Sequence, residues 1–269
     1  MTNDKLDNSA MPTNLHGKVA VITGAGSGLG FATASYFIQQ GAHVALLDIN
    51  AEQGQQAMQD LASEFAAFFA VDVTDETQID STLATIVKQF GQIDICINCA
   101  GIAPAKRILD KSGKAQPLSL FKHVIDINLI GSFNVAKSVA ELMAKNPIDS
   151  QQQRGVIINT ASIAGYEGQV GQTAYAASKA GLIGLCLAMA RDLAAHGIRV
   201  NTIAPGIMAT PMLLAMPQPV QDALAETVVQ PQRLGNPLEF AQLAQHICVN
   251  AYLNGETIRL DGGLRMAPK

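Results

Sequence analysis

Tyr175 and Lys179 stand four residues apart in the segment YAASK, inside a stretch, 173–196, whose composition predicts a helix. This spacing places the phenol and the ammonium on one helix face, with their Cβ atoms about 5–6 Å apart. A free tyrosine has a pKa of about 10. A neighbouring cation favours the phenolate and brings the group toward the range useful for general acid–base catalysis. The pair therefore indicates proton transfer at a substrate oxygen.

Ser162 lies thirteen residues before Tyr175, at the end of a predicted strand. Its hydroxyl could hydrogen-bond a substrate carbonyl or alcohol, because ligands bind at the carboxyl edge of a parallel sheet. Each of the three residues also has an ordinary alternative. Tyr175 could lie at the edge of the core, Lys179 could be solvated, and Ser162 could cap a helix. Their combination with the features below favours the catalytic interpretation.

A glycine-rich turn, TGAGSGLG, follows the first predicted strand. The literal G-x-G-x-x-G fingerprint is absent, and the spacing present is G-x-x-x-G-x-G at Gly24, Gly28 and Gly30. Such a turn permits a tight bend, a close approach of the backbone to a pyrophosphate, and a helix N-terminus directed at the anion. A glycine-rich turn without a ligand is the alternative.

Acidic residues end the second and third predicted strands. Asp48 follows Gly28 by twenty residues, and a carboxylate there can accept both ribose hydroxyls and repel a 2′-phosphate. No Arg or Lys lies between Lys18 and Asp48, so NAD is expected rather than NADP. A solvated Asp48 is the alternative. Asp72 could reach an adenine amino group, or it could take part with Thr74 and Asp75 in capping the next helix.

Strands alternate with helices along the chain, which predicts βαβ units and a parallel sheet. The fold class expected is α/β, a Rossmann-type doubly wound parallel sheet in a single domain, with a substrate-lid excursion over 204–235. A flexible leader is expected over 1–16 and the domain over 17–269. The predicted strands are 18–23, 43–47, 66–73, 93–98, 155–160, 198–203 and 257–260; the predicted helices are 31–40, 51–64, 75–90, 118–145 and 173–196, with short helical pieces over 219–248.

Composition narrows the class of protein. Apolar residues make up 48% of the 269 residues, charged residues only 15%, and the formal net charge is −4. An acidic chain lacks the basic footprint of a nucleic-acid binder, and the sparse charge suggests subunit contacts. The charge-free stretch 19–47 could span a bilayer by length, but its glycines and polar residues indicate strand, turn, helix and strand. No membrane partner is expected, and no targeting segment is evident, so the expected compartment is the cytoplasm.

The chain has four cysteines, two of them in the segment Cys96-Ile-Asn-Cys99. Side chains three residues apart on a strand point to opposite faces, so this pair cannot easily close a disulfide. No second pair supplies a zinc site. Buried thiols and no metal are expected.

These motifs resemble those of the short-chain dehydrogenase/reductase family over roughly residues 17–265. The matching motifs are TGAGSGLG at 23–30, Asn98-Cys-Ala-Gly101, Asn128 in INLIGSF, Ser162, Tyr175 with Lys179, and Pro205-Gly206 with Thr210. The family usually has Asn-Ala-Ala-Gly where this chain has Cys99 as the second residue. The family is commonly tetrameric, so the resemblance implies a homotetramer.

The resemblance also implies roles for individual residues. Tyr175 would be the general acid/base, and Lys179 would lower its pKa and hold the nicotinamide ribose. Ser162 would orient the reacting oxygen, while Asn128 would anchor a water linking Lys179 to solvent. The implied cofactor-binding residues are Gly24, Ser27, Gly28, Leu29, Gly30, Asp48, Asp72, Val73, Asn98, Cys99, Ala100, Gly101, Tyr175, Lys179, Pro205, Gly206, Met208 and Thr210.

The segments 156–181 and 253–266, with a short insertion after Gly101, resemble the members of the family that act on 3-hydroxyacyl-CoA. The resemblance therefore implies interconversion of 3-hydroxyacyl-CoA and 3-oxoacyl-CoA, including 2-methyl-branched short chains. A hydroxysteroid dehydrogenase, a 3-oxoacyl-acyl-carrier-protein reductase and a non-catalytic dinucleotide-binding scaffold are the alternatives.

Two segments could serve the substrate. The apolar, methionine-rich stretch 208–229 could cover an acyl chain, or it could be an ordinary packed helix pair. Four cations in the insertion could meet the phosphates of coenzyme A, or they could be solvated: Lys106, Arg107, Lys111 and Lys114.

Overall fold

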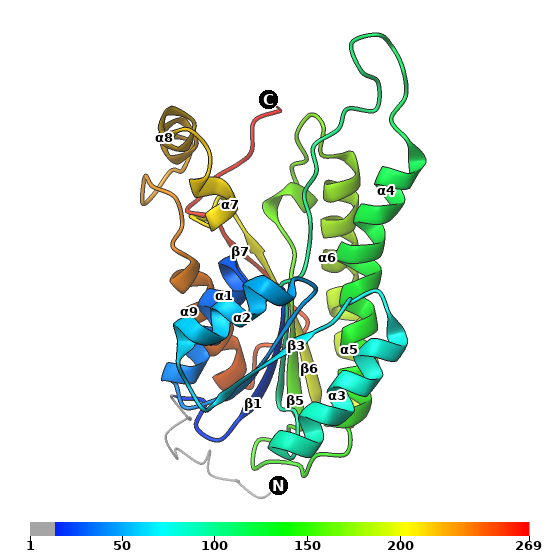
Figure 1. Cartoon of the computed structure of the whole chain (residues 1–269), viewed down its shortest axis with the longest axis vertical. Coiled ribbons are helices and arrows are strands. Elements are labelled where there is room, and N and C mark those ends of the chain that lie inside the picture. The colour runs from blue at the N-terminus through cyan, green and yellow to red at the C-terminus, as the bar shows by residue number, and fades with distance from the viewer. Residues whose placement is uncertain (1–13, 269) are drawn as a thin grey trace, which may run out of the picture.

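A seven-stranded parallel sheet forms the centre of the computed structural model, which describes residues 14–268 (Figure 1). The strands are β1 Val19–Thr23, β2 His43–Asp48, β3 Ala66–Ala70, β4 Ile95–Asn98, β5 Gly155–Thr160, β6 Ile198–Pro205 and β7 Thr257–Leu260. Their order across the sheet is β3-β2-β1-β4-β5-β6-β7. The predicted Rossmann-type doubly wound fold is confirmed.

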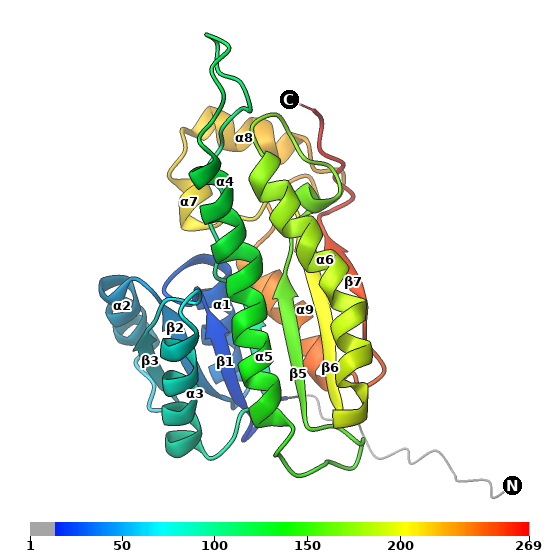
Figure 2. The same ribbon diagram turned by 90° about the vertical axis from the view of Figure 1, so that its right-hand side faces the viewer.

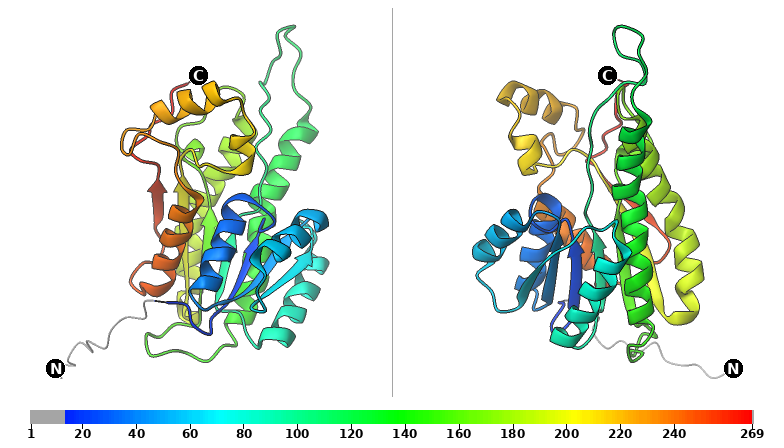
Figure 3. Two further views of the ribbon diagram at one scale, coloured as in Figure 1. Left: turned by 60° about the vertical axis from the view of Figure 1, so that its left-hand side comes forward. Right: turned by 45° about the vertical axis from the view of Figure 1, so that its right-hand side comes forward.

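Helices cover both faces of this sheet. Figures 2 and 3 show α3, α4, α5 and α6 on one face, and α1, α2 and α9 on the other. Their bounds are α1 Gly28–Gln39, α2 Ala51–Leu61, α3 Glu76–Phe90, α4 Leu118–Ile125, α5 Ser132–Met143, α6 Thr173–Leu193, α7 Pro211–Leu214, α8 Gln218–Glu226 and α9 Pro237–Val249. The short α7 and α8 lie beyond the carboxyl edge of the sheet (Figure 2).

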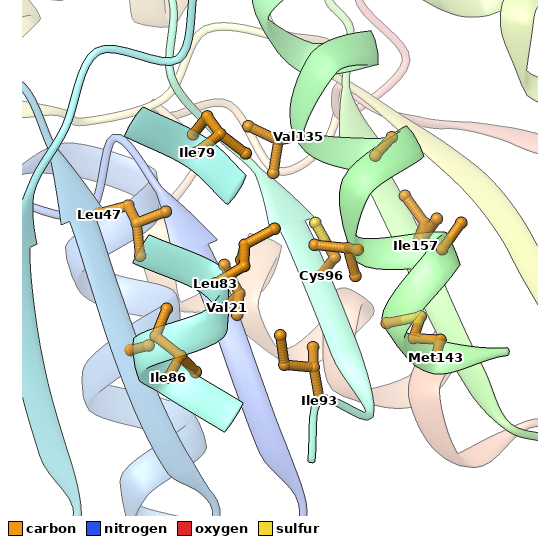
Figure 4. Packing of buried hydrophobic residues seen from close by; sticks show 14 of the residues in the cluster. Val21, Leu47, Ile79, Leu83, Ile86, Ile93, Cys96, Val135, Met143 and Ile157 are labelled. Atoms are coloured by element: carbon orange, nitrogen blue, oxygen red, sulfur yellow. The ribbon is translucent and has the colours of Figure 1, made fainter. Parts of the chain in front are cut away.

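Neighbouring residues of each central strand face two different cores, because side chains alternate across a sheet. Val21 of β1 and Leu47 of β2 pack into the core beneath α3 and α5, which Figure 4 shows from close by. Ile22 and Leu46 pack into the core beneath α1 and α9. Both faces of the central strands are therefore buried, as their continuous apolar sequences predict.

The order of the strands reverses between β1 and β4. The chain runs from β1 outward to β2 and β3, and then returns to β4 on the other side of β1. A crevice opens at the carboxyl ends of the strands where such a reversal occurs. Thr23 ends β1 at this reversal, and its hydroxyl accepts the backbone N–H groups of Cys99 and Ala100 at 3.1 Å each.

Several element boundaries differ from the sequence predictions. The first helix begins at Gly28, three residues early, because the last glycines of the turn already belong to it. The third strand ends at Ala70, three residues before its predicted end. A π-helical turn, Asp126–Gly131, interrupts the helix expected over 118–145. Such turns widen a helix locally and leave its apolar pattern continuous, so periodicity does not reveal them.

The leader expected over 1–16 lies mostly outside the described residues. Leu15 is described and is buried, and its N–H donates to the carbonyl of Gln40 at 3.0 Å. The packed part of the chain therefore reaches back at least to Leu15, two residues before the predicted start of the domain.

One helix among the described residues, Thr173–His196, has the length and apolar composition that could cross a membrane. It contains α6, which packs along β6 and α4 and carries both Tyr175 and Lys179. Leu182 and Cys186 are buried on α6. The helix is thus built into the α/β domain.

The excursion after β6 returns to the domain at α9. Arg233 and Glu239 form a two-pronged ion pair at 3.0 and 2.8 Å. Glu239 also accepts the backbone N–H of Asn236, which completes a capping box at the start of α9. The end of the predicted lid is therefore fixed to the first turn of α9.

Candidate active site

A cleft of about 640 Å³ opens at the carboxyl ends of β1, β2 and β4. Its walls include the turn between β1 and α1, the end of β2, the segment after β3 and the first residues of the excursion. Twelve of the predicted cofactor-binding residues line it: Gly24, Ser27, Gly28, Leu29, Gly30, Asp48, Asp72, Val73, Cys99, Ala100, Gly101 and Thr210.

The glycine turn leaves no room for side chains at two points. A Cβ on Gly24, whose φ is +62°, would lie 2.8 Å from the Cα of Ala100. A Cβ on Gly30 would overlap the carbonyl oxygen of Gly24. The turn can therefore press against the segment after β4, and Ser27 and Gly28 bring the N-terminus of α1 into the cleft wall. This cradle suits a pyrophosphate, because backbone N–H groups and the helix dipole favour an anion.

Asp48 lies at the β2 end of the cleft. One of its carboxylate oxygens accepts the N–H of Gly26 and the other accepts the N–H of Asn50, each at 3.0 Å. These two bonds hold the carboxylate in place between the glycine turn and the start of α2. A fixed negative charge at this position suits a ribose with free hydroxyls.

Asp72 also lines the cleft, but its carboxylate is already engaged locally. One oxygen accepts both the N–H and the hydroxyl of Thr74 at 2.8 Å. The N-cap of α3 is Asp75, which accepts the N–H of Gln78, and this bond holds the pKa of Asp75 below its ordinary value. Asp72 therefore shapes the turn before α3, while Asp75 caps the helix.

The other six predicted cofactor-binding residues are not among the residues that line the cleft within the described chain. Tyr175 and Lys179 lie beside it, and four more lie in the surrounding structure: Asn98, Pro205, Gly206 and Met208. Asn98 is buried, and its amide donates to Asn159 and to the carbonyl of Ser132, so it joins β4 to β5 and α5. Met208 is buried and pairs with Gly235 in an isolated bridge at the base of the excursion.

Ser162, Tyr175 and Lys179 lie together beside the cleft. The Nζ atom of Lys179 is 5.6 Å from the centre of the Tyr175 ring and donates to the carbonyl of Thr160 at 2.7 Å. The Ser162 hydroxyl accepts the N–H of Ala164 at 3.1 Å and lies close enough to the Tyr175 phenol to lower its pKa. A Cβ built on Gly101, in the cleft wall, would lie 3.6 Å from Lys179 Nζ. The three side chains thus meet at one end of the cleft.

Burial changes the acidity of the pair. It lowers the pKa of Lys179 to about 8. Burial also raises the pKa of Tyr175 above its ordinary value, while the hydrogen bond with Ser162 opposes this rise. Desolvation is the largest cause of this rise, and the Lys179 ammonium donates to the carbonyl of Thr160. The lowering of the Tyr175 pKa by Lys179 stays a prediction. At neutral pH the phenol is protonated and suited to donate a proton.

Asn128 lies in the π-helical turn and is fully buried. Its amide oxygen accepts the N–H of Ile102, and its amide nitrogen donates to the carbonyl of Ile102 and to the hydroxyl of Ser178. Asn128 therefore connects the segment after β4 to α6, one residue before Lys179. The bridging water that the resemblance implied stays a prediction.

The sequence analysis missed several residues of the cleft wall: Ile49, Asn50, Gln53, Ile102, His123 and Asp126. Asn50 could have been found, because it is of the residue type preferred at a helix N-cap and stands directly before the helix at Ala51. His123 and Asp126 stand three residues apart near Asn128, a spacing that places them on one helix face. The others carry no such signal.

No group of three or more His, Cys, Asp or Glu residues that could hold a metal ion occurs in the described part of the chain. Burial raises the pKa of the Cys99 thiol to about 11, so this side chain is neutral at the cleft wall. The reacting groups that the chain itself brings together are two hydroxyls and one ammonium, which can orient a substrate oxygen and transfer a proton to it.

Comparison with known proteins decides the family. A model described as short chain dehydrogenase matches residues 18–220. This chain belongs to the short-chain dehydrogenase family. The human 3-hydroxyacyl-CoA dehydrogenase type-2 is 49% identical over 256 residues, covering 95% of this chain and 98% of that protein. The crystal structure of 3-hydroxyacyl-CoA dehydrogenase type-2 from Mycobacterium avium has a TM-score of 0.90 and 40% identity, covering 94% of this chain and 98% of that chain.

A second group of relatives is more distant. The 3-oxoacyl-[acyl-carrier-protein] reductase FabG of Thermotoga maritima is 37% identical over 261 residues, covering 93% of this chain and 98% of that protein. The chain is therefore an oxidoreductase of this family that uses a nicotinamide dinucleotide. The turn that Gly24 and Gly30 allow to pack closely brings Ser27 and Gly28, at the N-terminus of α1, into the cleft wall, which fits the pyrophosphate of such a dinucleotide.

Proposed function

We propose that the chain is an NAD-dependent oxidoreductase that interconverts 3-hydroxyacyl-CoA and 3-oxoacyl-CoA, including 2-methyl-branched short chains. The observation that carries the proposal is the meeting of Ser162, Tyr175 and Lys179 beside Gly101 of the cleft. The relatives named 3-hydroxyacyl-CoA dehydrogenase type-2, of which the human protein is 49% identical along nearly the whole chain, support the substrate class.

The residues of the chain supply binding and proton transfer. In reduction, the Ser162 hydroxyl orients the carbonyl oxygen at carbon 3, and the Tyr175 phenol donates a proton to that oxygen. In oxidation, the phenolate of Tyr175 accepts the hydroxyl proton. Lys179 places a positive charge near the phenol and the cleft, which favours the phenolate. A bound nicotinamide dinucleotide supplies the hydride or accepts it.

The rate of ketone reduction is expected to fall as the pH rises through about 8, the pKa of Lys179. Tyr175 keeps its proton at neutral pH because burial raises its pKa. Lys179 is charged below about pH 8 and loses its charge above it, so the phenolate formed by proton donation then loses its cation. A pH profile of kcat for reduction measures this fall. A profile that stayed flat up to the ordinary pKa of tyrosine would show that the ammonium is not required.

NAD is proposed over NADP because of the charge at Asp48. Its carboxylate is held by Gly26 and Asn50 at one end of the cleft, and a 2′-phosphate would meet a like charge there. No Arg or Lys is among the residues that line the cleft within the described chain. Nothing in this wall therefore compensates the charge of a phosphorylated ribose.

The insertion after Gly101 forms an arm that stands out from the domain near α4 (Figures 1 and 3). Its two limbs pair at Leu109 and Ala115, and its base is held where the N–H of Lys106 bonds the carbonyl of Gly171. All four cations of the arm are exposed: Lys106, Arg107, Lys111 and Lys114. We propose that these cations contact the phosphates of coenzyme A.

Replacing these four cations together by serine is expected to raise KM for acetoacetyl-CoA roughly tenfold, since each exposed charge pair contributes up to about 1 kcal/mol. The effect should shrink at high salt, because exposed charges are screened. A ketone without coenzyme A, such as ethyl acetoacetate, is the control and should keep its KM. Equal changes for both substrates would contradict a phosphate contact.

The proposed function is tested by mixing the purified protein with NADH and acetoacetyl-CoA and following the NADH absorbance. A panel of kcat/KM values then compares acyl-CoA thioesters of several lengths, branched thioesters and hydroxysteroids, each with both cofactors. The highest kcat/KM is expected for a short acyl-CoA with NAD(H). A higher value for a steroid would favour the hydroxysteroid alternative, and no turnover of any substrate would favour the non-catalytic scaffold.

We also propose a homotetramer that acts in the cytoplasm. The outer face of α5 and α6 supports the assembly, because it holds a cavity of about 530 Å³ lined by apolar residues such as Phe133, Met189 and Leu193. Charged residues of both signs surround it, including Lys137 and Asp192. Light scattering of the purified protein measures the number of subunits, and a monomer would contradict the proposal.

A further inference from the structure

The segment between Ser162 and Tyr175 connects the two hydroxyl-bearing residues of the site. It begins with a short 3-10 turn, Ile163–Gly165, and runs to the start of α6 at Thr173. A Cβ on Gly165 would lie 3.0 Å from the backbone of Lys179, and a Cβ on Gly168 would lie 2.9 Å from the Cβ of Ala176. This segment therefore packs closely on α6, and we call residues 163–172 the connecting loop.

On its other side, the connecting loop is bound to the end of the chain. Glu167 forms a two-pronged ion pair with Arg259 of β7 at 2.8 and 3.2 Å. The same carboxylate accepts the backbone N–H of Met266 at 3.0 Å. Arg259 also donates to Asp261 at 2.7 Å and to the carbonyl of Leu264 at 3.0 Å. Glu167 is thus the point where three segments meet.

Further bonds join the connecting loop to the terminal segment 264–268. The N–H of Val170 donates to the carbonyl of Pro268, and the side chain of Gln169 donates to the carbonyl of Ala267. The Arg259 guanidinium lies 5.1 Å from the centre of the Tyr166 ring. Hydrogen bonding to Arg259 holds the pKa of Glu167 below its ordinary value, so the carboxylate is charged at neutral pH.

We propose that Glu167 is a positioning residue that holds the Ser162 hydroxyl against the Tyr175 phenol by clamping the connecting loop to Arg259 and the terminal segment. Glu167 stands five residues after Ser162 and eight before Tyr175, and it acts through the loop that joins them. The reaction to which it contributes is the one given under the proposed function, on which this inference rests.

The geometry of the clamp explains how one carboxylate can hold the loop. The two Glu167–Arg259 contacts join a planar guanidinium to a carboxylate through two N–H···O bonds, an arrangement that fixes orientation as well as distance. The two side chains are only 24% and 22% exposed, so water screens this pair less than a surface pair. Loss of the carboxylate leaves Arg259 and the Met266 N–H without this acceptor, so the loop is held to the terminal segment only by the bonds of Gln169 and Val170.

The test uses Glu167→Ala and Glu167→Gln in the full chain. The first readout is the pKa of Tyr175, measured from the tyrosinate absorbance directly after a rapid pH jump. Each protein is compared with a second version that also carries the Tyr175→Phe substitution. The difference between the two absorbances is the signal of Tyr175. Because the Ser162 hydroxyl lowers the Tyr175 pKa, the loss of this contact in Glu167→Ala should raise that pKa. Glu167→Gln retains an acceptor oxygen and should show a smaller rise.

The second readout is steady-state turnover with acetoacetyl-CoA and NADH. Glu167→Ala should lower kcat roughly tenfold, since a small misplacement of reacting groups slows the chemical step. KM for NADH should change less than about twofold, because Glu167 is not among the residues of the cleft wall.

The matched control is Asp94→Asn. Asp94 is a buried carboxylate directly before β4, at the amino-terminal edge of the sheet, where it accepts the N–H of Val19 and pairs with Lys18. The control also removes a charge from a partly buried ion pair that joins distant segments, but far from the site. It should lower Tm without changing kcat or the Tyr175 pKa.

The proposal is overturned if the Tyr175 pKa or kcat of Glu167→Ala equals the wild-type value. It is also overturned if Asp94→Asn, at the same loss of Tm, changes both quantities as Glu167→Ala does. If Glu167→Ala does not fold, Glu167→Gln decides by the same two criteria. If the wild-type protein does not turn over acetoacetyl-CoA, the proposed substrate is wrong. The Tyr175 titration needs no substrate, so it then decides the positioning role alone.

Discussion

A Tyr175→Phe variant is expected to lose about a thousandfold in kcat, within the range of about 10² to 10⁴ that general acid–base groups contribute, while it binds NADH almost as tightly as the wild type. Ser162 is the hydroxyl in contact with the phenol, and a serine is far less acidic than a tyrosine, so it cannot replace the lost acid. Stopped-flow and steady-state assays of NADH oxidation measure the loss, and fluorescence titration measures NADH binding.

Tyr252→Phe provides the matched control, because the same hydroxyl is removed from a side chain that is 98% exposed. It should leave kcat and Tm unchanged. Full turnover by Tyr175→Phe would remove the proposed acid and base. A large loss of NADH affinity in that variant would instead assign the Tyr175 hydroxyl a binding role, since the interaction lost would then be made before the transition state.

An Asp48→Asn variant is expected to reduce the preference for NADH over NADPH by roughly ten- to hundredfold in kcat/KM, equivalent to about 1.4 to 3 kcal/mol. Asparagine keeps an oxygen for the N–H of Gly26 or Asn50 but removes the negative charge. Most of the change should appear as a lower KM for NADPH, because the repulsion acts on the bound ground state as well as on the transition state.

The control for Asp48→Asn is Asp60→Asn, which removes a carboxylate from the exposed side of α2, where it accepts a hydrogen bond from Gln56. The cofactor preference should be unchanged in Asp60→Asn. A wild-type protein that used NADPH as well as NADH would contradict the assignment of Asp48, and so would an Asp48→Asn variant with unaltered preference. Both measurements need only initial rates with the two cofactors.

Much of the architecture follows from local sequence. The alternating strands and helices, the glycine turn at Gly24 and the acid at Asp48 are set by residues within about twenty-five positions of one another, so periodicity and spacing reveal them. The opposite facing of Cys96 and Cys99 also follows from the period of a strand, and the two side chains do pack into different cores. These features need no knowledge of distant contacts.

Other features depend on contacts between residues far apart in the chain. The helix predicted over 118–145 contains a π-helical turn at Asn128, whose amide pairs with Ile102 and Ser178, both distant in sequence. Asn98 belongs to a family motif, yet it is directed into the protein by bonds to Asn159 and Ser132. A motif shows that a residue type is present, but the neighbours decide which way its side chain turns.

The sequence by itself determined which groups could do chemistry: a phenol and an ammonium on one helix face, a serine at a strand end, and a carboxylate beyond a glycine turn. Only the tertiary structure decided the protonation state of these groups and the contacts that hold them in position. Burial, which no local pattern reports, raises the pKa of Tyr175 and lowers that of Lys179 to about 8. The pairing of Glu167 with Arg259, 92 residues apart, exists because folding brings the end of β7 beside the connecting loop.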